Sequence, residues 1–554
     1  MKAEVCFHGS DKKEDQMGRG YNDLRDHLKK LEEKGLLVRV RREINKDTEL
    51  HPLVRWQFRG GLAEADRKAF LFENVVDSRG KKYDIPVVVG AYAASRYVYA
   101  VGLGYEADEV VLNWERDLSR PIEPVVVSEG PVQEVVHRGQ ELKDMGMDQF
   151  PIPISTPGFD NAPYLTCAML ITKDPKTGIR NVGNYRAMIK AKDKLGVNFI
   201  GLDEKDAALH WHMCREKGIP LEAALVIGGS PTVAYASVTR VRYGIDELAV
   251  AGGLAHTPIQ LVKCKTVDIE VPAEAEIVIE GKIPTDYLEP EGPFGESHGY
   301  MDPRTFNPNL EITAITHRKN PIFVSWMSQV TPSESSAIKA AGLEATLFRY
   351  LKIERRVRSV SRVFLHEPLT NLRRVIFIQM KNPSKEEVWR ALYSAITFQP
   401  EVGKIIIAVS DDIDADNLDA VLWSLAYRMR PAEDTAIVKN RTKAHGPPFD
   451  VSGRRITEAF DSALLIDATL KEPFPPVSLP KKEYMEKAKK IWDELGLPPL
   501  KPQSPWFGYS LGSWSEELEE ESRLAVEGKY DLVGEKMSQM KITGSGIDEY
   551  LKKD

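Results

Sequence analysis

The densest group of acidic and basic side chains lies in residues 288–303, LEPEGPFGESHGYMDP. Glu289, Glu291, Glu296 and His298 stand there among glycines and prolines, which favour a shaped turn over a regular helix. Because Glu291 and Glu296 are five residues apart, one could hold a partner group while the other moves a proton. The same spacing also fits a solvated acidic turn without a chemical role.

A second polar group lies in residues 180–190, RNVGNYRAMIK. Asn181, Asn184, Tyr185 and Arg186 offer amide oxygens, a phenol and a guanidinium there. An asparagine oxygen can bind a hard cation, and arginine can hold a carboxylate through two parallel hydrogen bonds. An edge strand with a polar face would show the same pattern.

A third group, residues 202–214, combines acids with two histidines, namely Asp203, Glu204, Asp206, His210 and His212. The histidine spacing excludes the HExxH arrangement of a zinc-binding helix. The ordinary interpretation is a helix that starts with acids, because the helix dipole favours negative charge at that end. Glu247 stands just before an apolar helical stretch and allows the same interpretation.

Composition excludes several classes of function. The 554 residues include 75 Lys and Arg and 82 Asp and Glu, a net charge of −7, which argues against a protein that coats nucleic acid or an anionic membrane. The four cysteines are scattered without a CxxC pair, as in proteins with reduced thiols. No GxGxxG or GxxxxGKS/T motif is present and no GxSxG lies in a strand–turn–helix context, so standard nucleotide-binding and hydrolase sites lose support.

The ends and apolar runs of the chain bear on its location. The opening MKAEVCFHGSDKKEDQ has no apolar signal segment. No apolar run approaches the roughly 18 residues that a membrane-spanning helix needs. We therefore expect a cytoplasmic protein without a membrane span.

The patterns of helices and strands that must position these groups indicate a multidomain α/β (α+β) fold. Helical spacing in 21–37 and short β-rich runs predict an N-terminal α/β domain over 1–125. Many short strands predict a β-barrel or sandwich over 126–330, with helices at 204–218 and 243–255. Alternating helices and strands predict a partly parallel sheet over 331–475, and a helical tail follows over 476–554.

In their order along the chain, these groups resemble the UbiD family of reversible decarboxylases, which use prenylated FMN. The resemblance runs from Tyr21 to Thr469 and includes NVGNYRAM, AVAGGLA, VDIEVPAEAEIVIEG, EPEGPFGESHGY and SDDIDADNLDAVLWSLAYRMRP. It implies an N-terminal α/β domain, a central split β-barrel of the flavin-reductase kind and a C-terminal α/β oligomerisation domain. A dimer or hexamer is implied, as is a flavin prenyltransferase that supplies the cofactor.

The resemblance also assigns roles to individual residues. Those with a catalytic role are Arg186, Glu291 and Glu296. The implied ligands of a Mn²⁺ or Mg²⁺ ion, which ties the cofactor phosphate to the protein, are Asn181, Glu204 and Glu247. If the alignment with the family is shifted by one residue, Asp203 or Lys205 replaces Glu204. Carboxylate and amide oxygens suit both ions.

Further residues are implied to contact the cofactor, namely Asn184, Tyr185, Arg186 and Asp203, with Lys404 at its phosphate. A K⁺ ion near the same phosphate is implied as well, without assigned ligands. Residues 325–336, SWMSQVTPSESS, are expected to line the substrate pocket, because Trp326, Met327 and the serines could select the size and polarity of a ring.

The implied reaction is reversible, non-oxidative decarboxylation of an aromatic or α,β-unsaturated acid. It passes through a covalent cofactor–substrate adduct, release of CO₂ and protonation by Glu296. Alternatives within the family are an aromatic acyl-CoA decarboxylase and an enzyme that works toward carboxylation. More remote alternatives are a flavin reductase, which would need a hydride-donor site, and a non-catalytic subunit of a carboxylase complex, against which the intact Arg186, Glu291 and Glu296 speak.

Overall fold

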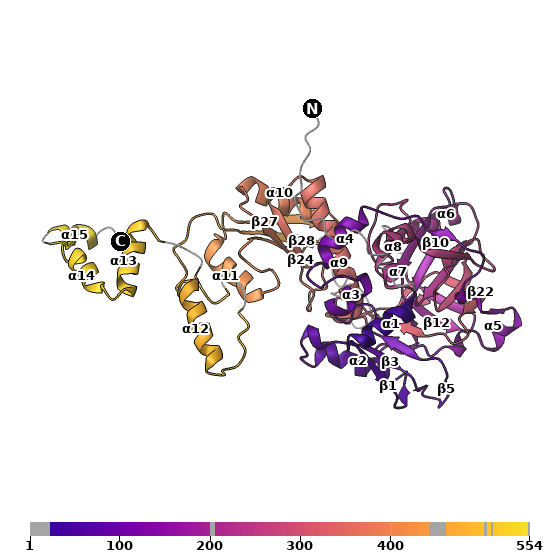
Figure 1. Ribbon diagram of the computed structural model, residues 1–554. Helices are drawn as coiled ribbons and strands as arrows, with labels where there is room; N and C mark the ends of the chain where they lie inside the picture. The colour runs from indigo at the N-terminus through magenta and orange to yellow at the C-terminus, as the bar shows by residue number, and fades with distance from the viewer. Residues whose placement is uncertain are drawn as a thin grey trace.

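The computed structural model describes residues 23–199, 205–399, 402–441, 461–502, 507–510, 514–543 and 545–551. Its described part has an N-terminal α/β layer, a large curled antiparallel sheet, a second α/β unit and a string of tail helices (Figure 1). This arrangement confirms the expected multidomain α/β class. Among the described residues, no helix is both long and apolar enough to cross a membrane.

The N-terminal part packs helices on a four-stranded sheet. The helices are α1 (Leu24–Glu33), α2 (Leu50–Arg59), α3 (Arg96–Leu103) and α4 (Val110–Leu118). The strand order is β1 (Leu37–Val40), β3 (Ala69–Phe72), β6 (Val87–Val89) and β23 (Phe323–Ser325). Because β23 pairs with β6 in parallel, a strand from far along the chain completes this sheet.

Helix α1 shows why the local sequence folds as it does. Asp23 caps its first turn by accepting a hydrogen bond from the Asp26 amide at 2.9 Å. Leu24, Leu28 and Leu31 form its buried face, and Gly35 follows with a positive φ of 69°, which suits a glycine after a helix end. The helix lies within residues 21–37, as the helical spacing predicts.

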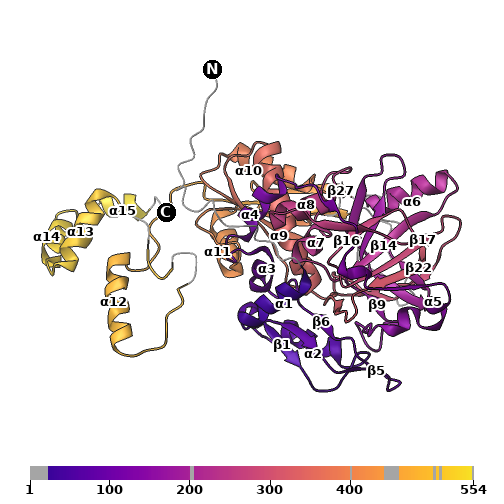
Figure 2. The same ribbon diagram turned by 45° about the vertical axis from the view of Figure 1, so that its right-hand side comes forward.

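A curled antiparallel sheet, the largest among the described residues, lies at the right in Figure 2 and carries the middle part of the sequence. Its path runs through β11 (Arg180–Asn184), β10 (Met169–Lys173), β14 (Leu221–Ile227), β17 (Ile277–Ile283), β22 (Asn309–His317), β13 (Lys194–Val197), β12 (Ala187–Ala191) and β9 (Tyr164–Leu165). Strand β8 (Val135–Arg138) also pairs with β22. The long β22 therefore joins three neighbours, since β13 and β8 pair with different stretches of it.

Helices and small strands surround this sheet. The helices are α5 (Gln140–Asp144), α6 (Asp206–Glu216), α7 (Pro231–Ala236) and α8 (Glu247–Ala255). The small pairs are β18 (Glu289–Glu291) with β21 (Thr305–Asn307), and β19 (Phe294–Gly295) with β20 (Met301–Asp302). Two further small sheets contain β2 (Ile44–Asn45), β4 (Val75–Val76) and β5 (Lys82–Tyr83), and β7 (Val125–Val126), β15 (Gln260–Lys263) and β16 (Glu270–Pro272).

The C-terminal α/β unit has its own sheet and its own core. The strand order is β24 (Val360–Leu365), β25 (Val375–Met380), β26 (Ile405–Ser410), β28 (Asp461–Ala468) and β27 (Thr435–Arg441). β25, β26 and β28 run parallel and both edges are antiparallel, which confirms the predicted partly parallel sheet. Its helices are α10 (Lys385–Ile396) and α11 (Leu418–Arg428).

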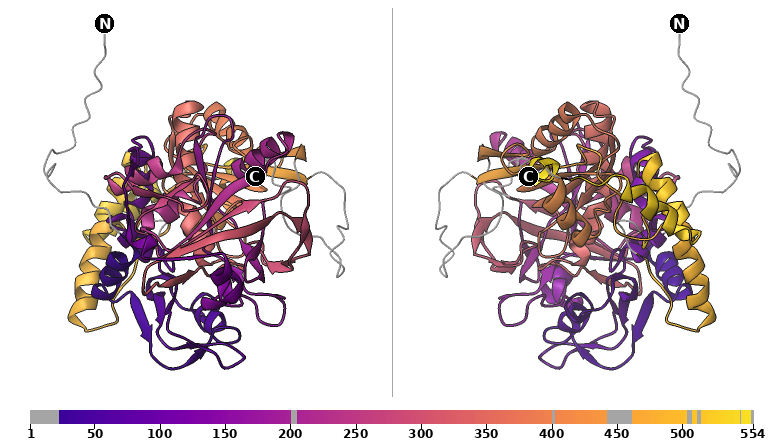
Figure 3. Two further views of the ribbon diagram at one scale, coloured as in Figure 1. Left: turned by 90° about the vertical axis from the view of Figure 1, so that its right-hand side faces the viewer. Right: turned by 90° about the vertical axis from the view of Figure 1, so that its left-hand side faces the viewer.

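Two units of packing follow from the apolar side chains. One continuous core contains side chains from Leu24 to Ala345 and so joins the N-terminal layer to the central sheet. A separate core begins at Leu347 and lies within the C-terminal unit. Helix α9 (Glu334–Arg349) contributes to both cores, and the left-hand view of Figure 3 shows the N-terminal layer below the large sheet. The predicted division at residues 125, 330 and 475 stays a prediction.

The tail helices lie apart from both cores in Figures 1 and 2. They are α12 (Lys482–Glu494), α13 (Glu516–Val526), α14 (Tyr530–Ser538) and α15 (Ser545–Leu551). None of the described residues of α12, α13 or α14 is buried. The tail therefore adds little packing energy to the body of the same chain.

Removal of residues 476–554 tests this separation. We expect the main thermal unfolding midpoint to change by less than about 2 °C, since no apolar side chain of α12–α14 is buried against the body. Scanning calorimetry of the full and shortened chains at equal concentration measures it. A fall of more than about 5 °C would show that the tail stabilises the folded body, for example by packing on a second copy.

Candidate active site

Arg186 lies at the break between two strands of the central sheet. β11 ends at Asn184 and β12 begins at Ala187. The Asn184 side-chain amide binds the segment between β9 and β10. Its Oδ1 accepts from Ala168 N at 2.8 Å and its Nδ2 donates to Thr166 O at 3.1 Å. This anchoring fixes the point at which the chain turns, and leaves the Arg186 side chain 9% exposed.

Glu291 holds the guanidinium of Arg186 from the small two-stranded sheet of β18 and β21. Arg186 Nε donates to Glu291 Oε1 and its second terminal nitrogen to Oε2, both at 3.0 Å. Asn198 and Asn307 also donate to Glu291 Oε2, at 3.0 and 3.4 Å. With a fully buried side chain, Glu291 cannot belong to a solvated acidic turn, so that alternative is wrong for this residue.

Two glycines make room for this pair. A Cβ on Gly196 of β13 would lie 2.8 Å from Lys190 Cε and 3.5 Å from Glu291 Cγ. Gly292 has φ 100°, where other residues are strained, and its ideal Cβ would lie 3.2 Å from Pro303 O. The turn after Glu291 thereby brings Phe294 over Arg186, whose guanidinium carbon lies 5.2 Å from the ring centroid.

Glu296 contacts the remaining terminal nitrogen of the guanidinium, and its side chain is less enclosed than that of Glu291. Its Oε1 forms a short ion pair with a terminal nitrogen of Arg186, and 27% of its side chain is exposed. The backbone around it is a tight turn, in which Glu296 N donates to Tyr300 O at 3.0 Å. Of the two acids, Glu296 is thus the one that a bound molecule can reach.

The charges of these groups act on one another. Burial alone would lower the pKa of Arg186, but Glu296 and Glu291 together raise it above its usual value. Burial raises the pKa of the neighbouring Asp160 to about 6, against two backbone hydrogen bonds and the positive charges of Arg55 and Arg186. Asp160 therefore titrates close to neutral pH beside the Arg186 cluster.

A second polar group forms where β11 meets the start of α8. Glu247 is the first residue of α8, and its Oε2 accepts from Val182 N at 2.8 Å. Burial raises the pKa of Glu247 to about 8. Asn181 is also buried, and its Nδ2 has no hydrogen-bond partner. A cation here would offset the cost of burying Glu247 and bind the oxygens of both side chains.

The remaining metal assignment falls outside the described residues. Asp203 and Glu204 lie in 200–204, and Lys205 caps α6. Within the ranges that the structure covers, no three His, Cys, Asp or Glu side chains are grouped as metal ligands. The three-ligand site on Asn181, Glu204 and Glu247 hence stays a prediction.

Polar atoms without hydrogen-bond partners lie on two loops, residues 155–160 and 326–329. Buried atoms without a hydrogen-bond partner include Ser155 Oγ, Asp160 Oδ1, Trp326 Nε1, Ser328 Oγ and Gln329 Nε2. Arg55 of α2 anchors the loop with Ser328 and Gln329, because it donates to Ser328 O at 2.9 Å and forms a short hydrogen bond with Gln329. Buried polar atoms are normally satisfied, so this group fits a polar ligand such as a flavin with its phosphate.

The structure does not bring every predicted residue to this place. Lys404 lies just before β26 in the C-terminal unit, where its Nζ pairs with Asp461 at 2.5 Å. Tyr185 is buried beside Gly183, and Asn184 uses its amide to join strands. Glu289 pairs with Lys190 and Lys194, which leaves it outside the Arg186 cluster.

Three residues at the site had no signal in the sequence, namely Asn198, Asn307 and Asp160. They come from separate segments and meet the cluster only through strand pairing and loop packing. The Arg186 backbone oxygen accepts from Asn198 N at 3.2 Å, which places Asn198 opposite Arg186. A register derived for β12 and β13 could have identified Asn198, but the local pattern could not.

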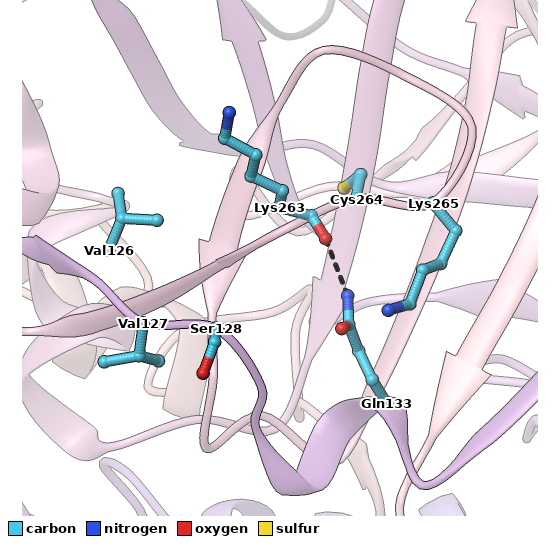
Figure 4. A pocket seen from close by; sticks show the side chains of 7 residues that line it. All are labelled: Val126, Val127, Ser128, Gln133, Lys263, Cys264 and Lys265. Atoms are coloured by element: carbon cyan, nitrogen blue, oxygen red, sulfur yellow. Dashed lines mark hydrogen bonds between the residues drawn. The ribbon is translucent and has the colours of Figure 1, made fainter.

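A surface groove of about 460 Å³ lies elsewhere, on the β7–β15 pair (Figure 4). Val126, Val127, Ser128, Lys263 and Lys265 are among its lining residues, and Gln133 Nε2 donates to Lys263 O at 2.7 Å. None of the elements that carry Arg186, Glu291 or Glu296 contributes to it. The groove is separate from the candidate active site.

Comparison with known proteins identifies the family. Models of the 3-octaprenyl-4-hydroxybenzoate carboxy-lyase family match residues 28–118 as its N-terminal domain, 124–330 as its Rift-related domain and 338–468 as its C-terminal domain. The chain belongs to the UbiD family. A relative from Aquifex aeolicus is 31% identical over 518 residues, which cover 87% of this chain and all of the relative.

Solved structures of UbiD enzymes share the fold. HmfF from Pelotomaculum thermopropionicum, in complex with prFMN, has a TM-score of 0.73 and 31% identity over 85% of this chain and 100% of its own. Vanillic acid decarboxylase from Sedimentibacter hydroxybenzoicus, in its closed form, has a TM-score of 0.72 and 27% identity over 86% and 99%. The UbiD chain described here is accordingly an enzyme of the carboxy-lyase class.

Asp160 gives this UbiD chain a pH dependence that can be measured. Its folded-state pKa of about 6 lies above the ordinary aspartate value, so the folded state binds the proton more tightly than the unfolded state does. Stability contributed by this group is present below about pH 4 and is lost as the pH rises through 6. Asp160→Asn should therefore raise the unfolding midpoint at pH 8 and change it little at pH 4.

Calorimetry of both proteins from pH 4 to 8 measures the difference. Asp148→Asn, at an exposed aspartate, serves as the control and should show no such trend. An equal effect of Asp160→Asn at both pH values would contradict the raised pKa.

Proposed function

We propose that this chain is a prenylated-FMN-dependent decarboxylase of an aromatic or α,β-unsaturated carboxylic acid that also works in reverse. The observation that carries the proposal is Arg186, which is buried, fixed by Glu291 and in contact with the more exposed Glu296. An aromatic acid is favoured because one similar structure is a vanillic acid decarboxylase.

The cofactor is proposed from the family and from the polar loops of this chain. Prenylated FMN supplies, when bound, the electron sink that accepts the bonding electrons of the lost carboxylate. Ser155, Ser328 and Gln329 provide buried donors and acceptors that lack partners in the protein. Asn181 and Glu247 would hold a Mn²⁺ or Mg²⁺ ion near the cofactor phosphate, with Glu204 or Asp203 as the third ligand.

Arg186 binds the reacting carboxylate. A guanidinium stays charged at any working pH and presents paired donors that match a carboxylate. Two of its donors are occupied by Glu291, and the one on Glu296 is the contact that a substrate can replace. Binding of the substrate carboxylate would then free Glu296 from its ion pair.

Glu296 moves the proton. It stands on a turn whose backbone hydrogen bond to Tyr300 fixes its position, while its side chain is exposed enough to meet the substrate. Freed from Arg186, Glu296 would take up a proton from solvent through its exposed side and, after CO₂ leaves, donate it to the carbon that carried the carboxylate. In the carboxylation direction it would accept the proton of that carbon and return it to solvent. Glu291 does not exchange protons in this scheme, because it is enclosed by Arg186 and two asparagines.

Further partners belong to the same proposal. A flavin prenyltransferase would supply the cofactor, K⁺ would accompany the phosphate, and the chain would act as a dimer or hexamer in the cytoplasm. One similar HmfF structure is an evolved dimeric form. The described tail of this chain leaves apolar side chains exposed, among them Leu495, Tyr530 and Met540.

Reconstitution tests the function directly. We expect protein co-expressed with a flavin prenyltransferase to contain a cofactor heavier than FMN by one prenyl unit, by mass spectrometry. It should exchange labelled bicarbonate into members of a panel of aromatic acids. Plain FMN together with NAD(P)H oxidation and no exchange would instead identify a flavin reductase.

Glu296→Gln tests the proton donor. We expect the cofactor content to be unchanged and the decarboxylation rate to fall about 10²- to 10⁴-fold, because an amide cannot donate this proton. Glu289→Gln is the matched control, since Glu289 lies in the same segment but pairs with Lys190 and Lys194. A Glu296→Gln rate near that of the wild type would remove this role.

Glu247→Gln tests the metal site. Loss of a ligand should lower the divalent metal retained after gel filtration by at least about tenfold, measured by elemental analysis. Glu344→Gln is the control, because Glu344 is equally enclosed and burial also raises its pKa, to about 7. Unchanged metal content in Glu247→Gln would show that the ion is held elsewhere.

A further inference from the structure

Two histidines face each other where strand β8 joins the large curled sheet. His137 lies in β8, and His317 is the last residue of β22. Because His317 pairs with Val135 in this antiparallel ladder, the two histidines lie on one face of the strand pair as diagonal neighbours. Their ring centroids are 5.2 Å apart and their Nε2 atoms 3.1 Å apart. Two side chains from distant parts of the chain therefore meet through their ring nitrogens.

The other ring nitrogen of each histidine faces an oxygen that can only accept a hydrogen bond. His317 Nδ1 lies 2.6 Å from the backbone oxygen of Arg318. His137 Nδ1 lies 3.3 Å from a carboxylate oxygen of Glu141. Each Nδ1 must then carry a hydrogen, and a neutral imidazole has only one N–H. In the neutral pair, the lone pairs of the two Nε2 atoms therefore meet at 3.1 Å.

The distance between the two Nε2 atoms suits a metal ion that binds both of them. Two lone pairs this close repel each other unless a proton or a metal ion is shared between them. Zn²⁺ binds imidazole nitrogen at about 2.0–2.1 Å, which places two such ligands about 3.3 Å apart in a tetrahedral site and about 2.9 Å apart at a right angle. The observed 3.1 Å lies between these values.

The groups around the histidines are those that support metal ligands. A metal-bound histidine usually donates its second ring N–H to a carboxylate or a backbone carbonyl. Glu141 of α5 and the Arg318 carbonyl fill these two positions, and α5 lies beside β22 at the right of Figures 1 and 2. Phe150 packs at a right angle on the His317 ring, with centroids 5.8 Å apart. These contacts orient both rings without an ion.

Access and charge also favour a metal ion at this pair. The His137 side chain is 14% exposed, so an ion can enter from solvent, and water can fill the coordination positions that the histidines leave open. Burial lowers the pKa of His317, which favours the neutral form that a metal ion needs. The guanidinium of the neighbouring Arg318 is held by Asp23 and Glu274 at 3.0 and 2.8 Å, so its charge is compensated.

We propose that His137 and His317 bind a divalent transition metal ion such as Zn²⁺, Ni²⁺ or Cu²⁺, for which imidazole is a suitable ligand. The ion fastens β8 to the end of β22, the strand with which β8 pairs among the described residues. The site shares no residue with the proposed ligands Asn181 and Glu247. In the sheet, β17, β14 and β10 separate β22 from β11, which carries Asn181.

Zinc binding to the full chain tests this site. The protein is freed of metal with EDTA, passed through gel filtration and titrated with ZnCl₂ by calorimetry, as wild type, His137→Gln, His317→Gln and Glu141→Gln. His366→Gln is the matched control, because His366 is also partly buried but its Nδ1 contacts Thr370 Oγ1 at 2.9 Å in the C-terminal unit. Electron paramagnetic resonance with Cu²⁺ in place of Zn²⁺ counts the imidazole ligands.

We expect the wild type and the control to bind Zn²⁺ equally, with two imidazole ligands. Glu141→Gln should weaken this binding about tenfold, as loss of an outer carboxylate does, and loss of either histidine should weaken it at least about 100-fold. Saturating Zn²⁺ should raise the unfolding midpoint of the wild type by about 2–4 °C and that of His137→Gln not at all. Glu141→Gln changes an exposed side chain, so the test remains decisive if a histidine variant does not fold.

Two results would overturn the inference. Zinc binding that Glu247→Gln removes and His137→Gln leaves intact would place the ion at the active site. Absence of stabilisation by Zn²⁺ in the wild type would show that the pair shares a proton in place of a metal ion. Neither readout uses decarboxylation, so a failure of the proposed function would leave this test unaffected.

Discussion

Burial of the Arg186 guanidinium is the constraint on which the rest of the site depends. The side chain is only 9% exposed, and removing the partner of such a buried charge would lower the stability of the fold by about 3–5 kcal/mol. The protein must therefore supply an acid with matching geometry. Glu291 meets this need with two parallel hydrogen bonds, and Asn198 and Asn307 satisfy one of its oxygens. Both oxygens of Glu291 are held by hydrogen bonds from Arg186, so neither side chain can move without breaking them.

Several separate segments of the fold hold the Arg186–Glu291 pair in place. Arg186 comes from the break between β11 and β12, Glu291 from β18, and the asparagines from the segments after β13 and in β21. β22 links these parts, since it pairs with β13 at one end, with β8 at the other and with β17 along its length. The curled sheet therefore positions the ion pair through long-range strand register, which local sequence does not encode.

The sequence predicted those parts of the fold that local signals determine. The apolar spacing of residues 21–37 predicted a helix where α1 lies, and the alternation of helices and strands over 331–475 predicted the sheet that α10 and α11 accompany. Arg186, Glu291 and Glu296 were found because they lie in long motifs. Asn198, Asn307 and Asp160 were not predicted, because each meets the site only after strands or loops from different segments pack together. The pairing of β23 with β6 was missed for the same reason.

The two acids of the site differ because their surroundings differ, although they belong to one motif. Glu291 is enclosed, bound to three side chains and unable to move without leaving Arg186 unpaired. Glu296 has a single side-chain partner and partial access to solvent. A substrate carboxylate that takes its place on Arg186 would therefore displace Glu296 and not Glu291. Under the proposed function, Arg186 would in this way couple carboxylate binding to the release of Glu296, the proposed proton donor.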